Sequence, residues 1–462
     1  MIKLKTKEMK DIIKKTGSLF ILTFLLSFAV VASNYEKAGK IEKEFEINQH
    51  TRIEFTNKSS DLLIRKWDKQ AVRLECNYKL KANDEEDIAK TIDALENLRV
   101  ENSPNLLAIT TSIFTNVKST ILPGLMNKIV ATLSNGTSVN LSEYEIEYVL
   151  TLPDNHDFKL YQKYSDLNMP DYSGNLELDL YDVDVRAGRL VNAKILTSKY
   201  SNIIVGTLGD CEVDIYDTDV EVETMGHLNM KSKYSKFEVD VVGTVNIDSY
   251  DDKLFFNSLE SIKGQAKYTD FEIGNIKSGD LDLYDCELKA KDCEKLKLVG
   301  KYSGIVFNNI GIFEFPDCYD NKVDAKTVGE FSTISKYTEF NFEQIKGMID
   351  FETYDDKLTV GQIDEDFYLI KIKGKYAKID LDIMGNPKFF MDVDIKYTNY
   401  ELPPDLLFSN IDNKSSKFVA SGRTEGLKSS DEVMVKKDNA GIRKANIGRI
   451  SIEQYDGTLK IK

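Results

Sequence analysis

The sequence predicts an all-β protein, a parallel β-solenoid (β-helix) of about 17-residue coils. Three observations support this prediction. The phrase Lys-Tyr, followed by Ser, Thr or Ala, returns eight times between residues 163 and 398. A second phrase, Tyr-Asp, stands between its first seven copies. Short runs with apolar residues two apart separate the two phrases, which is the period of a β-strand.

The spacing of the phrases defines the repeating unit. Successive Lys-Tyr copies are 36, 34, 34, 34, 35 and 39 residues apart, then 21, and the interleaved tyrosines follow one another mostly at 16 to 19 residues. A helical array could have a 34-residue period, but runs such as Cys211–Ile215 and Val220–Glu223 alternate and are bounded by Gly206, Gly209 and Gly226. We therefore expect coils of two or three strands that bury their apolar faces against one another.

Equivalent residues of stacked coils form ladders, so we expect the repeated tyrosines to stack. At about 4.8 Å per coil, fourteen positions predict a rod of roughly 65 Å. Alternation back from Tyr284 points its ring outward, whereas alternation back from Tyr234 points its ring inward, so the side of the ladder stays open. The predicted structural ladder is Tyr164, Tyr181, Tyr200, Tyr216, Tyr234, Tyr250, Tyr268, Tyr284, Tyr302, Tyr319, Tyr337, Tyr354, Tyr376 and Tyr397.

The residue after each tyrosine also alternates, between Ser or Thr in one phrase and Asp in the next. We interpret this as a corner ladder in which hydroxyl groups separate the carboxylates and donate hydrogen bonds to them. A structural role is the favoured interpretation of these residues.

Residues 1–33 predict a signal peptide, because six lysines precede the apolar run Leu19–Val31 and small residues follow it at Ala32 and Ser33. The run is short for a membrane anchor, and no Cys follows it that would mark a lipoprotein. We expect an exported protein of the periplasm or cell surface with no stable membrane span after cleavage.

Residues 34–160 predict an N-terminal cap with the first strands and one helix, residues 84–98, capped by Asn83 with Glu86 at the capping-box position. An apolar stretch, Ile113–Asn135, predicts a loop or short helix over the open end of the solenoid. The alternative is a helix that docks on a membrane or partner. The repeat solenoid should span residues 161–402.

The N-terminal part resembles the bacterial putative-adhesin β-solenoid family, a family of unknown function. The resemblance rests on Ile53–Asn57, Ile64–Asp68, Val72–Leu74, the acidic helix start Glu85-Glu86, and Tyr144–Pro153. It covers about residues 40–400 and implies the solenoid fold and, more weakly, an adhesin-like role. The chain departs from the family pattern at the Tyr-Ser and Tyr-Asp phrases and at the insert 113–135.

Residues 403–462 predict a C-terminal cap, in which Arg449–Ile461 returns to the Tyr-Asp phrase as the terminal coil or cap strand. The full chain carries a net charge of −15. Removal of the leader takes away six lysines and two acids, which leaves 55 basic and 74 acidic residues, or −19. This charge excludes nucleic acid as a partner and permits divalent cations.

No residue pattern predicts a catalytic, cofactor or metal site. The three histidines, His50, His156 and His227, are scattered. Acids recur in every second coil, whereas a catalytic pair should be singular; weak Ca²⁺ binding by such groups is the one ion interaction we consider. Cys211 and Cys318 should be buried, and Cys286 and Cys293 could pair. The acidic groups are Asp179, Asp182, Asp184; Asp214, Asp217, Asp219; and Asp280, Asp282, Asp285.

The favoured function is a non-enzymatic exported binding or scaffold protein, adhesin-like at the cell envelope, whose partner is a protein or glycan of the envelope or the extracellular surface. The alternative is a carbohydrate-binding or polysaccharide-acting protein that uses the lateral face of the solenoid, since tyrosine rings can stack on sugar faces.

Overall fold

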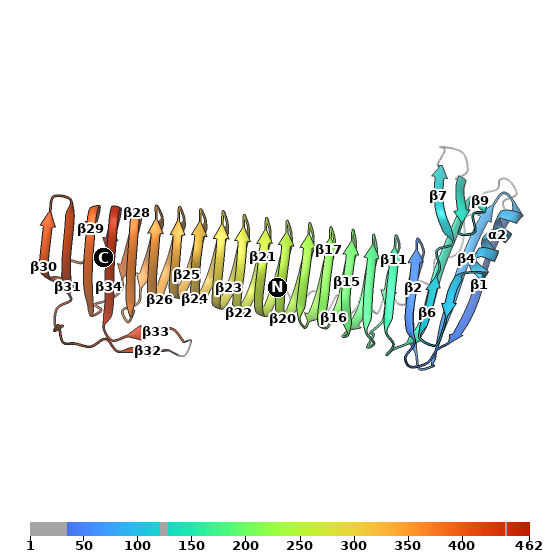
Figure 1. Ribbon diagram of the computed structural model, residues 1–462, viewed down its shortest axis with the longest axis horizontal. Coiled ribbons are helices and arrows are strands. Elements are labelled where there is room, and N and C mark those ends of the chain that lie inside the picture. Colours follow the sequence, from blue (N-terminus) through green and yellow to red (C-terminus); the bar gives the residue numbers. More distant parts are fainter. Residues whose placement is uncertain (1–34, 121–127, 439–440) are drawn as a thin grey trace, which may run out of the picture.

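The computed structural model describes residues 35–120, 128–438 and 441–462. It forms a rod of stacked parallel coils with a β-rich cap at its N-terminal end (Figure 1). The prediction of a parallel β-solenoid with a cap that contains one helix is confirmed, with about 13 turns and coils of about 18 residues. The predicted signal peptide lies outside the described residues. Among the described residues, no helix has the length and apolar character needed to span a membrane.

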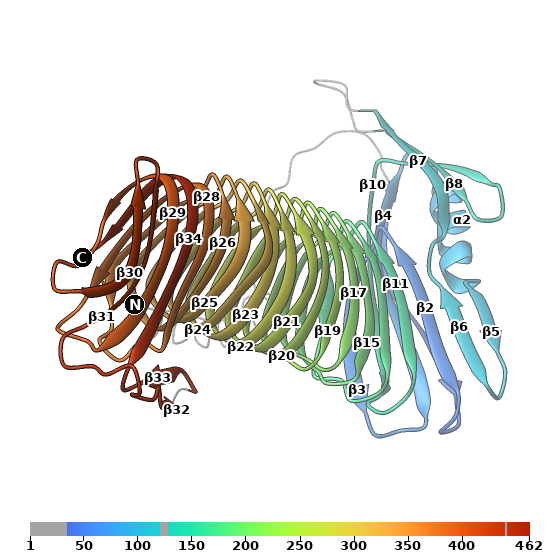
Figure 2. The ribbon, with the colours of Figure 1, turned by 60° about the vertical axis from the view of Figure 1, so that its left-hand side comes forward.

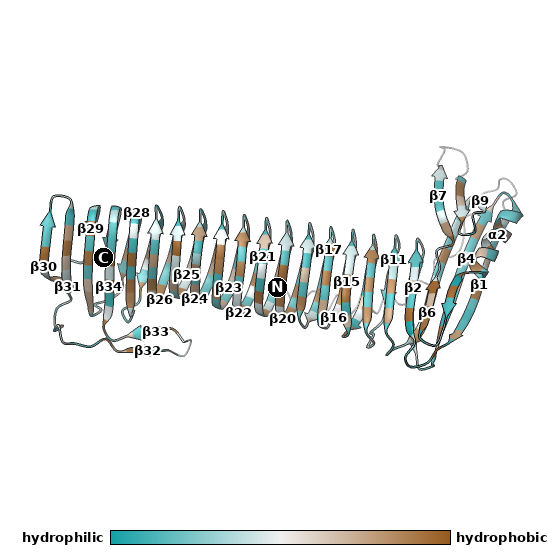
Figure 3. Ribbon diagram, viewed as in Figure 1, coloured by the Kyte–Doolittle hydropathy of each residue, from teal (hydrophilic) through white to brown (hydrophobic). Residues whose placement is uncertain are grey.

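The alternation of apolar and polar residues explains the coil. In β17 (Cys211–Tyr216), Cys211, Val213 and Ile215 are buried and the residues between them are exposed. The next strand, β18 (Asp219–Met225), buries Val220 and Val222 in the same way. Figure 3 shows this alternation of hydrophobic and hydrophilic residues along the strands. Every coil thus contributes one layer to a continuous apolar core.

Each coil has two corners. The first corner follows the tyrosine phrase and is a tight turn; we call the strand before it the first-sheet strand and the strand after it the second-sheet strand. From β20 (Lys236–Tyr250) to β26 (Glu339–Tyr354) the second corner is smooth enough for one continuous strand to pass through it. Where it is sharp it depends on glycine: a Cβ on Gly209 would lie 1.9 Å from the carbonyl oxygen of Val191.

Figure 2 shows the coils stacked in chain order. Their strands are β11 (Phe158–Lys163), β12 (Leu167–Met169), β13 (Leu176–Tyr181), β14 (Asp184–Leu190), β15 (Ala193–Lys199), β16 (Asn202–Leu208), β17, β18, β19 (Leu228–Lys233), β20 (Lys236–Tyr250), β21 (Lys253–Lys267), β22 (Asp270–Tyr284), β23 (Glu287–Lys301), β24 (Gly304–Tyr319), β25 (Lys322–Lys336), β26 (Glu339–Tyr354), β27 (Lys357–Ile363), β28 (Leu369–Ile383) and β29 (Phe389–Glu401).

The first coil comes from much earlier in the chain. β2 (Arg52–Lys58) pairs in parallel with β11, and β3 (Asp61–Trp67) pairs in parallel with β12. Ser59 turns the corner between them with a φ of 60°. Most of the cap is therefore an insertion between the first and second coils, and β1 (Tyr35–Glu46), which also belongs to the cap, precedes the first coil. The inserted part contains β4 (Ala71–Ala82), β5 (Arg99–Asn102), β6 (Leu106–Thr110) and β10 (Glu143–Pro153), with β4 antiparallel to both β1 and β10.

The predicted helix is α2 (Glu85–Glu96), and its cap differs from the expected one. Asp84, not Asn83, is the N-cap, and its side chain accepts a hydrogen bond from the Glu86 amide at 2.9 Å. Three acidic residues follow in the first turn, where their negative charges interact favourably with the positive end of the helix dipole. Ile88 and Leu95 are buried against the cap.

The insert 113–135 is neither a loop nor a helix in its described part. β7 (Phe114–Thr120) and β8 (Lys128–Leu133) form an antiparallel hairpin, and β9 (Ser138–Leu141) pairs with β8 as a third strand. The β-branched residues along both strands favour this extended pairing over a helix. The alternative of a docking helix is therefore wrong for these residues.

The C-terminal end has an order that differs from the chain order. β31 (Lys417–Arg423) covers β29 in antiparallel fashion, and β30 (Leu407–Lys414) pairs with β31 at the end of the rod. The chain then turns back, forms the hairpin of β32 (Val435–Lys437) and β33 (Arg443–Ala445) along the side of the rod, and enters β34 (Gly448–Ile461) (Figure 1).

β34 is not the terminal coil that the sequence analysis expected. It lies between β28 and β29, parallel to both. Its register explains this position: Tyr455 stands opposite Lys375 on one side and Lys396 on the other. Without β34, these two lysines would face each other directly, which is unfavourable for like charges.

Candidate functional site

The most regular surface of the molecule is the row of first corners. From β11 onward the last residue of each first-sheet strand alternates between Lys and Tyr from coil to coil: Lys163 stands opposite Tyr181, and Tyr181 stands opposite Lys199. The same alternation continues to Lys396. The first coil departs from this order, because its Lys58 stands opposite Lys163. Every coil therefore places either a cation or an aromatic ring at the strand end.

The next residue, at the corner itself, alternates between Tyr and Asp in a left-handed conformation. Tyr200 and Asp217, for example, have φ values of 57° and 48°. The two phrases are thus offset by one residue, and the aspartate of one coil stacks on a tyrosine of the next. Our interpretation of a Ser/Thr–Asp ladder is therefore wrong, because the tight turn shifts the register of the two phrases.

The Ser or Thr of the first phrase faces inward at the corner. Ser303 Oγ donates to its own Lys301 carbonyl at 3.0 Å and accepts the Cys286 amide of the neighbouring coil at 3.1 Å. Ser201, Ser235, Thr269 and Thr338 repeat the bond to the carbonyl two residues earlier. The hydroxyl closes the turn and joins two coils, which explains why the phrase needs a small hydroxyl residue.

In the intervening coils the same inward position holds other groups. Asp252 accepts the Ser235 amide at 2.8 Å, Asn321 accepts the Ser303 amide at 2.9 Å, and Asp356 accepts the Thr338 amide at 2.8 Å. Burial raises the pKa of both aspartates, and hydrogen bonds from nearby serine and threonine groups partly oppose that rise. The corner is thus held from inside by a polar ladder.

The rings form one unbroken ladder on the outer edge. Tyr234 is 46% exposed and Tyr397 is 54% exposed, so the open question about their direction is settled: the left-handed corner turns these rings outward. Consecutive rings meet edge to face, with centroids 5.3 to 6.3 Å apart and interplanar angles of 73° to 84°. Such geometry adds about 0.5–1.5 kcal/mol per pair.

The structure brings all fourteen predicted tyrosines together and adds a fifteenth. Tyr455 of β34 fills the place between Tyr376 and Tyr397. One sequence signal could have located it: Lys375 and Lys396 are the two copies that have no Tyr-Asp phrase between them, and Tyr455-Asp456 supplies it. We call these fifteen residues the tyrosine ridge.

Lysines and neighbouring rings set the electrostatics of the ridge. Lys375 Nζ lies 5.2 Å from the ring centroid of Tyr376, 5.7 Å from that of Tyr354 and 5.9 Å from that of Tyr455. Lys163 lies 5.6 Å from the ring of Tyr181. Desolvation, followed by the influence of adjacent tyrosines, raises the pKa of the corner tyrosines Tyr200, Tyr234, Tyr268, Tyr302 and Tyr337. Their hydroxyl groups are therefore neutral donors at physiological pH.

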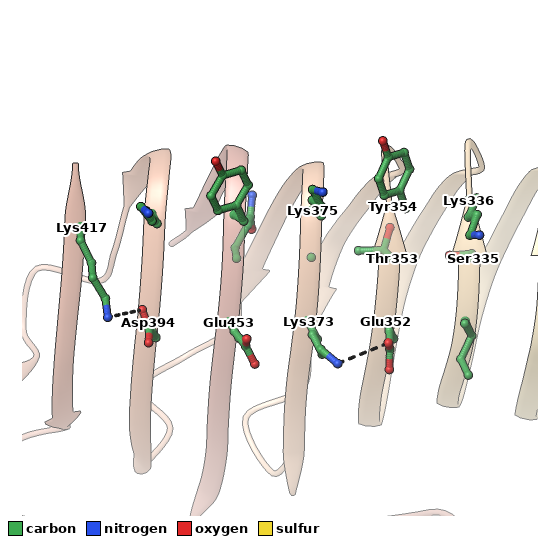
Figure 4. Close-up of a pocket in the computed structure, with 15 residues that line it drawn as sticks. Ser335, Lys336, Glu352, Thr353, Tyr354, Lys373, Lys375, Asp394, Lys417 and Glu453 are labelled. Atoms are coloured by element: carbon green, nitrogen blue, oxygen red, sulfur yellow. Dashed lines mark hydrogen bonds and ion pairs between the residues drawn. The ribbon is translucent and has the colours of Figure 1, made fainter.

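The outward face of the first-sheet strands runs beside the ridge and is hollowed. A hollow of about 830 Å³ crosses β15 to β22 and is lined by Asp214, Lys231, Asp248, Lys263 and other polar groups. A second hollow, of about 550 Å³, lies against the ridge near β34 (Figure 4). There Lys373 pairs with Glu352 at 3.5 Å, below Tyr354 in Figure 4, and Lys417 pairs with Asp394 at 3.4 Å at the left of the view.

The predicted acidic groups do not converge. In two groups one acid lies on a first-sheet strand, one at the corner and one on the second-sheet strand, as Asp214, Asp217 and Asp219 illustrate. In the third group Asp280 and Asp282 lie on one first-sheet strand and Asp285 lies at the corner. The corner turns such residues toward different sides. In the part of the chain that the structure describes, no three His, Cys, Asp or Glu side chains gather as a metal site. Weak Ca²⁺ binding stays a prediction.

The histidines and cysteines occupy structural positions. His156 is buried, with Nε2 3.1 Å from the Asn48 carbonyl oxygen, while His50 is exposed and His227 lies at a second corner. Cys286 and Cys293 are both buried and free, so the pairing we considered is not formed. Cys76, Cys211 and Cys318 are likewise buried and free, and burial raises the pKa of the Cys76 thiol to about 11.

Comparisons with known proteins identify no family for this chain. No protein-family model and no curated protein matches the chain. One similar solved structure is described as a "putative cell adhesion protein" from Clostridium sporogenes, with 8% identity over 92% of this chain and 99% of that chain. Its TM-score of 0.15 is too low to support an inference about this protein.

Proposed function

We propose that this protein is a non-enzymatic, exported scaffold that binds a partner at the cell surface through the tyrosine ridge, in the manner of an adhesin. The observation that carries the proposal is a row of fifteen consecutive aromatic rings along one edge of a rod, of which eleven are exposed and Tyr181, Tyr216, Tyr319 and Tyr354 are half-buried. Packing between coils requires buried residues, and the core supplies those elsewhere. Large exposed aromatic residues in a contiguous row mark binding surfaces on soluble proteins.

The stiffness of the rod supports the same function. Almost every strand of the rod pairs with a parallel strand on each side, and hydrogen bonds of the inner polar ladder stabilise the corners. A rigid array that repeats one surface many times binds an extended or repeated partner with avidity, because successive contacts form at high effective concentration.

A test combines location with a ridge variant. Protease treatment of intact cells should release peptides from residues 160–400; release only after permeabilisation of the envelope would contradict a surface role. The triple variant Tyr200→Asn, Tyr234→Asn, Tyr268→Asn removes three rings and keeps residues that tolerate the left-handed corner. It should bind the surface of producing cells at least tenfold more weakly than the unchanged protein.

A matched control changes the opposite sheet of the same coils. Glu221, Glu238 and Glu272 are exposed on second-sheet strands, and their replacement by Gln leaves the ridge intact. This control should bind like the unchanged protein. Equal binding by the ridge variant and the control would refute the role of the ridge.

The carbohydrate-related alternative is favoured by a separate observation. The hollow of about 830 Å³ beside the ridge is lined by carboxylates, lysines and the amides of Asn229 and Asn246, together with apolar groups such as Ile195, so that it offers both hydrogen-bond partners and apolar contacts to a sugar. An enzyme acting on polysaccharides would release new chain ends and would lose that activity on replacement of one carboxylate pair. We propose binding without cleavage, and an assay for released ends tests this.

A further inference from the structure

We infer that the tyrosine ridge binds an uncharged linear β-1,4-linked glycan that lies along the rod axis. This inference rests on the proposed function and names its ligand class. Three properties of the ridge carry it: its charge, its repeat and the polar surface beside it.

The charge of the ridge favours an uncharged ligand. Each pair of coils presents one lysine and one tyrosine from the first phrase, then one tyrosine and one aspartate from the second. The net charge of this unit is zero, although the chain as a whole carries −15. A polyanion would be repelled by the protein as a whole, and a polycation would find a lysine in every second coil.

The repeat of the ridge spans two coils. Corner tyrosines such as Tyr200 and Tyr234 come from the left-handed position, whereas Tyr216 between them comes from the strand end, and its ring is 77° from that of Tyr200 and 82° from that of Tyr234. Equivalent rings therefore recur every second coil, at about 9.6 Å. In an extended β-1,4-linked glycan alternate sugars are turned over, so that the chain also repeats every two units, over a similar length.

The surroundings supply the polar contacts that sugars need. Sugar rings offer apolar C–H faces, which pack on aromatic rings, and hydroxyl groups at their edges, which need hydrogen-bond partners. Next to the ridge, Asp248 accepts a hydrogen bond from Gln265 at 3.2 Å, and Asn246 donates to Asn229 at 2.5 Å. Asp248, Asn229 and Asn246 line the hollow; Asp248 and Asn229 are exposed and Asn246 is half-buried. Aromatic faces flanked by amides and carboxylates match both parts of a sugar.

The test measures binding of the purified protein to oligosaccharides of defined linkage. Cello- and chito-oligosaccharides of four, six and eight units should bind with affinity that rises at least tenfold from four to eight units, because a longer chain reaches more coils. β-1,3-linked and α-1,4-linked oligosaccharides of equal length should bind at least tenfold more weakly, because their repeats do not follow the ridge. Carboxymethyl cellulose should bind more weakly than hydroxyethyl cellulose.

Ridge variants connect this binding to the tyrosines. The triple change of Tyr200, Tyr234 and Tyr268 to Asn should lower the affinity for the eight-unit chain at least tenfold, and the change of the same residues to Phe, which keeps the rings, should retain most of it. The Glu221, Glu238 and Glu272 control should match the unchanged protein. Melting curves establish that each variant is folded, and the Phe variant keeps the test valid if the Asn variant is not.

The possible outcomes distinguish a failure of the ligand assignment from a failure of the proposed function. Equal affinity for β-1,4 and β-1,3 chains, or no dependence on chain length, would overturn the glycan inference. If glycans do not bind but the Asn variant still loses attachment to cells, the ligand assignment fails and the scaffold function stands. If the Asn variant keeps both glycan binding and attachment, both fail.

Discussion

At the scale of the residue, the side chains that face inward at the first corner form hydrogen bonds that are as regular as the ring contacts on its outer side. The hydroxyl of Ser303 donates to the Lys301 carbonyl of its own coil and accepts the buried Cys286 amide of the preceding coil. A buried amide without a partner costs about 1–3 kcal/mol, so Ser, Thr, Asn or Asp is favoured at this position in most coils. Val183 and Ala377 show that a few coils fold without such a side chain.

The two buried aspartates of this ladder give a prediction about pH. Burial raises the pKa of Asp252 in the folded protein above its value in the unfolded chain. The folded state therefore holds the proton more tightly, and this group's contribution to stability falls as pH rises from the ordinary Asp pKa through the raised one. Asp252→Asn should raise the melting temperature at pH 8, and the gain should shrink as pH falls through the raised pKa and vanish near the ordinary Asp pKa of about 4.

Asn321 already occupies the equivalent position in another coil and accepts the same type of amide bond, so the substitution fits. The control is Asp251→Asn, which removes the same charge from an exposed corner residue. A melting temperature for Asp252→Asn at pH 8 equal to or below that of the unchanged protein would contradict the assigned burial cost.

At the scale of the element, the position of β34 depends on an ion pair, Glu330–Arg443, on the side of the rod. Glu330 is 4% exposed and accepts the Arg443 amide at 2.7 Å, Arg443 Nε at 3.1 Å and Arg443 Nη2 at 2.8 Å. The guanidinium also lies 4.7 Å from the ring centroid of Tyr368. Arg443 thus holds the β33 segment against coils more than a hundred residues earlier in the chain.

Loss of this pair should loosen the C-terminal segment. Arg443→Met leaves the Glu330 carboxylate buried without its cation, and we expect a loss of about 3 kcal/mol, because a buried charge then lacks compensation. Amide hydrogen exchange should accelerate in β34, because β34 directly follows Arg443 in the chain. The double variant Glu330→Gln, Arg443→Met should recover part of the stability.

The matched control is an exposed pair near the same end of the molecule. Lys414 lies 3.2 Å from Asp412, with both side chains more than half exposed. Lys414→Met should change stability by less than about 1 kcal/mol. Equal losses of stability in the Lys414 and Arg443 variants would show that the Glu330–Arg443 ion pair does not hold β34 in its position.

At the scale of the whole molecule, the true repeat is two coils, because Lys and Tyr alternate at the strand end and Tyr and Asp at the corner. Deletion of residues 234–267, a stretch of 34 residues, joins Lys233 to Tyr268 and preserves both alternations. We expect a folded rod that is shorter by about 9.6 Å, which small-angle scattering can measure.

Deletion of a single coil is the control. Removal of residues 234–250 joins Lys233 to Asp251 and places Lys233 beside Lys267 and Asp217 beside Asp251 in the ladders. It also removes two rings, which leaves a gap in the ridge. This variant should melt at a lower temperature than the two-coil deletion, although it loses fewer residues. The opposite order would show that the alternation has no energetic role.

The sequence alone predicted the coil, because the period and the apolar alternation are local properties that each coil repeats. For the same reason it located fourteen tyrosines of the ridge, the helix of the N-terminal cap, and the buried cysteines Cys211 and Cys318. The helix cap moved by one residue to Asp84, since both Asn83 and Asp84 can accept the amide bond and the chain uses the one that fits its entry into the helix.

Only the tertiary structure decided what depends on register and on contacts distant in the chain. The one-residue offset between the two phrases shows in the sequence as alternating steps, 16 residues from Tyr200 to Tyr216 and 18 from Tyr216 to Tyr234, but its meaning depends on the left-handed corner, which the structure revealed. Likewise, β2 and β3 form the first coil and β34 lies between β28 and β29, because parallel strands pair with whichever neighbour completes their ladder and not with the nearest in sequence. The outward direction of the ridge follows from that corner geometry, so the candidate binding surface emerged only in the folded rod.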